Sequence, residues 1–132
     1  MELRKVLLVD DEKDLVSSLK LDLEAKGYSV ITAQDGNSAL ELARKENPQL
    51  VLLDLMLPGL DGYRVLKLLK SDERYRQIPI LVITARADVA DLTQAMECGA
   101  DGCLVKPLKL DVLLNRVDTL IGKERQGNGH SV

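Results

Sequence analysis

The chain has 132 residues, of which 45% are hydrophobic and 30% charged, and these values predict one domain built around a single core. The net charge of −3 gives no basic footprint, so we expect no direct nucleic-acid binding by this domain. No segment has the roughly 18 to 20 uncharged apolar residues that span a membrane, and the N-terminus lacks the apolar region of a signal peptide, so we expect no membrane association and a cytoplasmic protein.

Short apolar runs alternate with segments of helical period, and this alternation predicts repeated βα units around a parallel sheet. The predicted strands are Val6–Val9, Tyr28–Ala33, Leu50–Leu53, Ile80–Ile83 and Cys103–Val105. The first, third and fourth are apolar on both faces, as central strands between two helical layers must be. The second is mixed and the fifth is short, which is typical of edge strands. The sequence therefore predicts an α/β, flavodoxin-like, doubly wound (βα)5 sheet with the strand order 2-1-3-4-5.

The segments between these strands have apolar residues at helical spacing, each followed by a stop signal. The residues expected to face the core are, helix by helix, Leu15/Leu19/Leu23, Ala39/Leu40/Ala43, Leu66/Leu69, Val89/Leu92/Met96 and Leu113/Val117/Leu120. Asn37 or Ser38 is expected to cap the second helix, and Gly122 to end the fifth. Residues 123–132 are polar and lack an apolar period, so we predict a domain over 1–122 and a tail or the start of a linker over 123–132.

Polar side chains follow the predicted strands at the edge where such folds bind ligands. Asp10 and Asp11 follow the first strand and Asp54 follows the third, and the strand order reverses between these two strands. Thr84 ends the fourth strand and Lys106 follows the fifth. Because the carboxyl ends of parallel strands meet at one edge, we expect three carboxylates, a hydroxyl and an ammonium to converge there.

The chemistry of this set points to phosphoryl transfer. Clustered carboxylates repel one another and are retained most readily when a cation compensates them, and Mg²⁺ binds one or two carboxylates together with a phosphate. Asp54 stands alone at the end of a central strand, so it is the candidate nucleophile. The Lys106 ammonium and the Thr84 hydroxyl can contact phosphoryl oxygens, and a bond from Thr84 to phosphate would pull its loop.

Four segments carry a resemblance to a known family: VLLVDDE at 6–12, LVLLDLMLPGLDG at 50–62, ILVITA at 80–85 and GADGCLVKPL at 99–108. They are similar to the receiver domain of two-component response regulators, of the chemotaxis-regulator type, over residues 5–122. The resemblance implies a phosphoacceptor signalling domain that is not an enzyme in the usual sense, although it catalyses its own Mg²⁺-dependent phosphorylation and dephosphorylation. It implies that Asp10 and Asp11 are the acidic metal pair, that Asp54 is phosphorylated, and that the Met56 backbone carbonyl is a metal ligand. It also implies that Thr84 and Lys106 bind the phosphoryl group, and that the bond before Pro107 is cis.

The resemblance also implies partners. A sensor histidine kinase or a histidine phosphotransfer protein would donate the phosphoryl group by docking around the first helix. A downstream output domain or protein partner would bind the face of the fourth helix, fifth strand and fifth helix, where Asp101 and Arg116 resemble charges that some regulators pair across a homodimer. On the fifth strand, three residues before the lysine, the family usually has a Tyr or Phe that takes part in the switch, whereas this chain has Cys103. We therefore expect the switch to act through Thr84 and the backbone that follows it.

Other interpretations of the same residues stay open at this level. Each polar side chain has a structural alternative: a helix cap for Asp10-Asp11 or Thr84, a strand-end cap for Asp54, and a solvated amine for Lys106. A flavodoxin-like electron carrier would need aromatic rings, whereas aromatic residues are 2% of the chain and there is no Trp or Phe. A Mg²⁺-dependent phosphohydrolase generally has a second aspartate two residues after the nucleophile, where this chain has Met56. A receiver fold that serves only as a constitutive binding module is disfavoured because the phosphoryl-site residues are present.

Overall fold

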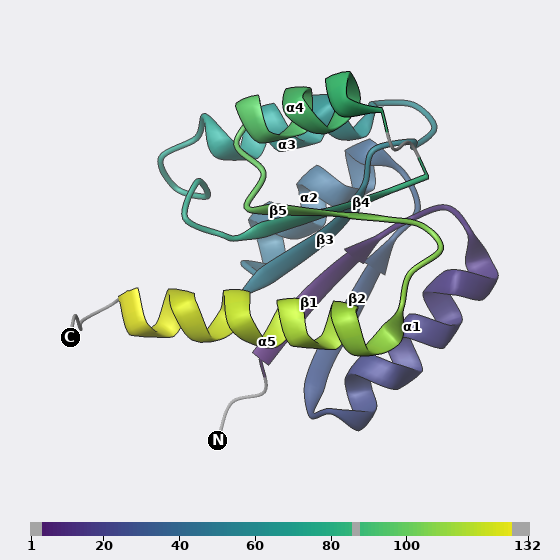
Figure 1. Cartoon of the computed structure of the whole chain (residues 1–132). Helices are drawn as coiled ribbons and strands as arrows, with labels where there is room; N and C mark the ends of the chain where they lie inside the picture. Colours follow the sequence, from purple (N-terminus) through teal and green to yellow (C-terminus); the bar gives the residue numbers. More distant parts are fainter. Residues whose placement is uncertain (1–3, 86–87, 128–132) are drawn as a thin grey trace.

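The computed structural model describes residues 4–85 and 88–127, and within these ranges a five-stranded parallel sheet has the predicted order β2-β1-β3-β4-β5 (Figure 1). The strands are β1 (Arg4–Val9), β2 (Tyr28–Ala33), β3 (Leu50–Asp54), β4 (Ile80–Thr84) and β5 (Gly102–Val105). The predicted β2 has the observed bounds, and the other predicted strands differ by one or two residues at one end. The flavodoxin-like fold class is therefore confirmed.

Two helical layers cover the sheet. Helices α1 (Lys13–Ala25) and α5 (Leu110–Gly127) lie on one face, and α2 (Gly36–Glu46), α3 (Gly62–Lys70) and α4 (Val89–Glu97) lie on the other (Figure 1). Successive residues of a strand point to opposite faces, so Leu8 packs in the α1–α5 cluster while Leu7 and Val9 pack in the α2–α3–α4 cluster. This two-sided burial explains why β1, β3 and β4 are apolar along their whole length.

The helical predictions hold for the core residues of α1, α2, α3 and α5, with Leu15 only partly buried. The predicted cap of α2 was wrong: Asp35 is the N-cap, and its carboxylate accepts a hydrogen bond of 2.8 Å from the Ser38 backbone N–H. Asp35 directly precedes the helix and accepts from the N–H three residues later, which is the usual capping geometry. At the other end of α2, Asn47 has φ 49 and ends the helix in the left-handed conformation.

The predicted inward face of α4 was wrong for Val89 and Met96, whereas Leu92 is partly buried. Ala95 is the buried residue of this helix, while Val89 is 79% and Met96 50% exposed. Helix α4 packs on the short edge strand β5, which offers little apolar surface, so a small side chain suffices on the inner face and the larger apolar ones face outward.

The predicted end of the last helix at Gly122 was wrong as well, because α5 continues to Gly127. Gly122 has no positive φ and an added Cβ would meet nothing, so this glycine fits within a helix and provides no stop. The part of the predicted tail over residues 128–132 lies outside the described residues. No helix in the described ranges is both long and apolar enough to cross a bilayer.

Candidate functional site

Three carboxylates meet where β1 and β3 end. Val9 and Leu53 are paired in the sheet, so the residues that follow them, Asp10 and Asp54, lie side by side at its edge. Asp10 is fully buried and Asp54 is 3% exposed, whereas Asp11 is exposed. One oxygen from each of the three aspartates lies within 4.8 Å of the others. The predicted convergence of these carboxylates is therefore present in the structure.

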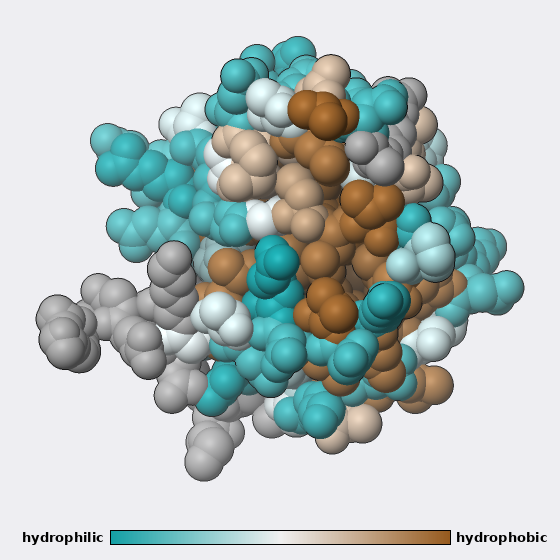
Figure 2. All heavy atoms as spheres, in the orientation of Figure 1, coloured by the Kyte–Doolittle hydropathy of each residue, from teal (hydrophilic) through white to brown (hydrophobic). Residues whose placement is uncertain are grey.

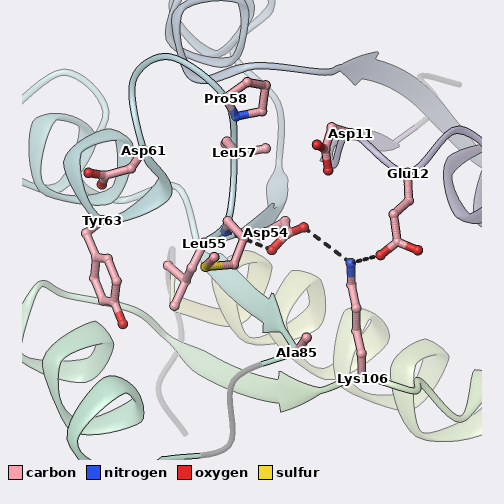
Figure 3. A pocket seen from close by; sticks show the side chains of 11 residues that line it. Asp11, Glu12, Asp54, Leu55, Leu57, Pro58, Asp61, Tyr63, Ala85 and Lys106 are labelled. Carbon is pink, nitrogen blue, oxygen red and sulfur yellow. Dashed lines mark hydrogen bonds and ion pairs between the residues drawn. The ribbon is translucent and has the colours of Figure 1, made fainter.

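The Lys106 ammonium, supplied by the residue after β5, lies among these acids (Figure 3). Its Nζ is 2.9 Å from Asp10 Oδ2 and 3.2 Å from Asp54 Oδ2, and the Lys106 side chain is only 13% exposed. A third carboxylate also binds it, since Glu12 Oε1 lies 2.6 Å from Nζ. The sequence reasoning missed Glu12, although its place as the third acid after β1 was the available signal.

The remaining predicted residues lie on the same edge. Thr84 ends β4 and is fully buried, and its carbonyl oxygen accepts a 2.8 Å hydrogen bond from the Lys106 backbone N–H. The Lys106–Pro107 peptide bond is cis, as expected. Cys103 on β5 is partly buried and packs against the core, with its Sγ 3.8 Å from Met96 Sδ. Met96 of α4 therefore covers part of the Cys103 side chain.

The pKa values of Asp54 and Lys106 are both raised, which favours the neutral form of Asp54 and the charged form of Lys106. Burial raises the pKa of Asp54, and the nearby Asp10 carboxylate adds to the rise, while the Met56 N–H and Lys106 partly offset it. Burial by itself would lower the pKa of Lys106, but its interactions with the Glu12 and Asp10 carboxylates outweigh burial and raise that pKa. The ammonium therefore stays charged, whereas burial and the Asp10 charge disfavour the ionised form of Asp54.

A pocket of about 690 Å³ opens above Asp54. Besides the acids and Lys106, the residues Leu55, Met56, Leu57, Pro58, Asp61, Tyr63 and Ala85 line it (Figure 3). The Met56 backbone N–H donates a 2.9 Å hydrogen bond to Asp54 Oδ1, which fixes one oxygen of this carboxylate, and the Met56 side chain is 46% exposed. The other oxygen, Oδ2, faces Lys106.

The loop between β3 and α3 is held in place by two glycines. A Cβ at Gly36 would lie 1.9 Å from the Leu60 carbonyl oxygen, and one at Gly62 would lie 2.6 Å from the Asp54 carbonyl oxygen. The Gly62 N–H also donates a 3.1 Å hydrogen bond to the Leu55 carbonyl. This loop therefore packs directly on the backbones of its neighbours, and larger residues at either glycine would displace it.

The residues fit a magnesium ion. The donor set consists of carboxylate oxygens, which are the ligands that Mg²⁺ prefers. Asp10 Oδ2 is buried and accepts no hydrogen bond from the described part of the chain, so its neighbour Lys106 contributes an ion pair only. A buried oxygen without a hydrogen-bond donor can still coordinate a cation.

Comparison with known proteins agrees with this geometry. A family model described as "Response regulator receiver domain" matches residues 6–118. The chain is 42% identical over 118 residues to the alkaline phosphatase synthesis transcriptional regulatory protein PhoP of Bacillus subtilis (strain 168), covering 89% of this chain and 48% of PhoP. It is 40% identical over 125 residues to the response regulator MprA of Mycolicibacterium vanbaalenii, covering 95% of this chain and 53% of MprA. The chain thus spans about half the length of these curated relatives.

Among solved structures, the chain is similar to the receiver domain of the sensor histidine kinase PA1611 from Pseudomonas aeruginosa PAO1, with a TM-score of 0.84, 30% identity and coverage of 92% of this chain and 99% of that one. That structure is described with a magnesium ion coordinated in its active-site cleft. The family model covers most of the chain, and the strand order and the acidic edge agree with it. This chain therefore belongs to the response regulator receiver domains of two-component signalling systems.

Proposed function

We propose that Asp54 accepts a phosphoryl group in a Mg²⁺-dependent reaction, and that Asp10, Asp11, Asp54 and the Met56 backbone carbonyl hold the ion. The observation that carries this proposal is the convergence of the three aspartates around the buried Lys106 ammonium. When bound, Mg²⁺ offsets the negative charge on the oxygens of the phosphoryl group. The domain thereby catalyses its own phosphorylation and dephosphorylation.

In the transfer step, an Asp54 carboxylate oxygen forms a bond to phosphorus while the bond from phosphorus to the donor breaks. With a phosphohistidine donor, the imidazole leaves and takes up a proton, and the product is an acyl phosphate. Lys106 contacts one phosphoryl oxygen through its ammonium and Thr84 contacts another through its hydroxyl. The movement of Thr84 then pulls the backbone that joins β4 to α4.

Intact mass measurement after incubation with acetyl phosphate and Mg²⁺ tests the proposal. We expect one added phosphoryl group that hydroxylamine removes, and no addition to Asp54→Asn. Asp61→Asn is the matched control, since Asp61 lines the same pocket and an asparagine retains its cap on α3. A phosphoryl group mapped to serine, threonine or histidine would contradict the assignment.

We also propose that a sensor histidine kinase or a histidine phosphotransfer protein docks beside α1. A second pocket of about 550 Å³, lined by Leu15, Leu19, Pro107, Leu108 and Leu110, lies between α1 and the segment after β5 and shares Glu12 and Lys106 with the site. Ser18→Arg, at its exposed rim, should slow transfer from a phosphohistidine donor by about tenfold and leave acetyl phosphate reactivity unchanged. Glu24→Arg, on α1 outside this pocket, is the control.

The output surface that we propose is the face formed by α4, β5 and α5, where Figure 2 shows hydrophobic side chains gathered between the two helices. Met96 and Val105 are exposed there and supply apolar contact area for an output domain or a protein partner. A homodimer through this face would rely on such contacts, because Asp101 is already bound within the chain by Lys70 at 2.8 Å and by the Ile80 N–H. Sedimentation with and without beryllium fluoride tests dimer formation.

The free thiols Cys98 and Cys103 support a cytoplasmic location.

A further inference from the structure

Glu12 differs from the other carboxylates that bind Lys106. Asp10 and Asp54 contact the ammonium and also belong to the cluster of three aspartates whose oxygens lie within 4.8 Å of one another. Glu12 makes the shortest of the three contacts, at 2.6 Å, and is not part of that cluster. Its side chain is 60% exposed, and it reaches the ammonium from the side opposite Asp54 (Figure 3).

Two cations therefore compete for the same buried oxygens. A metal ion held by Asp10 and Asp54 would draw on the same carboxylates that now face Lys106, and it would repel the ammonium. The Lys106 side chain is only 13% exposed, so an ammonium displaced without a partner would be a poorly solvated charge. Glu12 is the member of the three whose carboxylate remains available.

We propose that Glu12 is a positioning residue that holds the Lys106 ammonium at the edge of the site while a divalent cation occupies the aspartates. The inference rests on the metal site of the proposed function. Glu12 does not contact the phosphorus atom or the ion. It acts through Lys106 by keeping the ammonium ordered and close enough to move onto a phosphoryl oxygen when one arrives.

Nuclear magnetic resonance of ¹⁵N-lysine-labelled protein observes the ammonium directly, because an ion pair slows its proton exchange with water. In wild-type protein saturated with Mg²⁺ we expect the Lys106 ammonium resonance to persist. In Glu12→Gln it should be lost on addition of Mg²⁺, although it is visible before, since Asp10 and Asp54 then still hold it. A resonance that survives Mg²⁺ in Glu12→Gln would overturn the proposal.

A double-mutant cycle separates positioning from simple charge attraction. Glu12→Gln should weaken Mg²⁺ binding, measured by titration calorimetry, by roughly threefold to tenfold. In a Lys106→Met background the same substitution should have almost no effect, because the residue through which Glu12 acts is gone. An equal effect in both backgrounds would mean that Glu12 attracts the ion only through its charge, and would overturn the inference.

Asp14→Asn is the matched control, since it removes an exposed acid two residues away in the first turn of α1 and should leave Mg²⁺ affinity within about twofold. The two proposals fail differently. If wild-type protein neither binds Mg²⁺ nor is phosphorylated on Asp54, the proposed function is wrong. If it does both while the cycle shows no coupling between Glu12 and Lys106, only the role of Glu12 is wrong.

Discussion

The Tyr63 hydroxyl donates a 3.1 Å hydrogen bond to the backbone carbonyl of Asp91, and so joins the start of α3 to the first turn of α4. Tyr63 also lines the pocket above Asp54. One side chain therefore connects the candidate phosphorylation site with a helix of the proposed output face. A ring at this place can couple the two, even though β5 has Cys103 where an aromatic residue would be usual in the family.

Tyr63→Phe should loosen α4 with little effect on the rest of the domain. The lost hydrogen bond should cost about 1 kcal/mol of stability. Amide hydrogen exchange in α4 should become faster, while exchange in α1 and α2 should not change. Tyr75→Phe is the control, since Tyr75 lies in the segment after α3, where its ring is 5.1 Å from the Arg74 guanidinium. Unaltered exchange over Val89–Glu97 in Tyr63→Phe would show that the bond does not restrain this helix.

The pKa of Asp54 predicts a pH dependence of stability in the absence of Mg²⁺. Burial first, and then the Asp10 charge, raise the pKa of Asp54 in the folded protein above the ordinary value near 3.8. The unfolded chain therefore ionises Asp54 at lower pH, and this residue reduces stability progressively as pH rises from the ordinary value through the raised one. The cost is fully present above the raised pKa.

Asp54→Asn should accordingly melt at a higher temperature than wild type at pH 7 without metal. The difference should shrink as pH falls through the raised pKa of Asp54, where the wild-type carboxyl becomes protonated. Mg²⁺ should raise the melting temperature of the wild type more than that of the variant. Calorimetry across this pH range provides the measurement, and equal melting of the two proteins at pH 7 would mean that the carboxylates do not destabilise the metal-free fold.

Tyr28 on β2 predicts a second pH dependence at the opposite end of the scale. Its hydroxyl is buried and hydrogen-bonds to the Asp118 carboxylate on α5, and burial together with this bond raises the pKa of Tyr28 to about 12. The unfolded residue ionises near pH 10, so stability should be lost between about pH 10 and 12. Tyr28→Phe should cost about 1 kcal/mol at pH 7 and should flatten this loss. Urea unfolding at pH 7, 10 and 11 would reveal it, and an identical slope in both proteins would refute the assignment.

Cys103→Tyr should fold, despite the partial burial of this residue. A ring there must displace the Met96 side chain, which is half exposed and flexible, so we expect a cost of about 1 kcal/mol. Beryllium fluoride should then change hydrogen exchange in β5 more than it does in the wild type, where α4 should respond most. Cys98→Ser serves as a control for thiol loss on the same face. A variant that fails to fold would show that α4 cannot yield at this contact.

The fold and most of the site could be predicted because strong periodic signals position them. Strands apolar on both faces required two helical layers, and the residues after those strands had to share one edge, which brought Asp10, Asp54 and Lys106 together. The exposed face of α4 was not predictable from its apolar spacing, since its burial depends on how much surface the neighbouring edge strand offers. Glu12 was missed because it lies one residue beyond the acid pair that directly follows β1, and its longer side chain is what allows it to reach Lys106.

The close packing around Gly36 and Gly62 gives the two sides of the site different mechanical properties. In the β3–α3 loop, which carries Met56, the Leu60 backbone packs against Gly36 of α2, and Gly62 at the start of α3 packs against the Asp54 backbone, with no room for a side chain at either glycine. The β3–α3 loop can therefore hold its position while the ion binds. Helix α4, in contrast, packs few large side chains onto the sheet. A signal at Asp54 should therefore be converted into motion on one side only. Alanine at Gly36 or Gly62 should then impair phosphorylation by moving the β3–α3 loop, without touching any group that binds the phosphoryl oxygens.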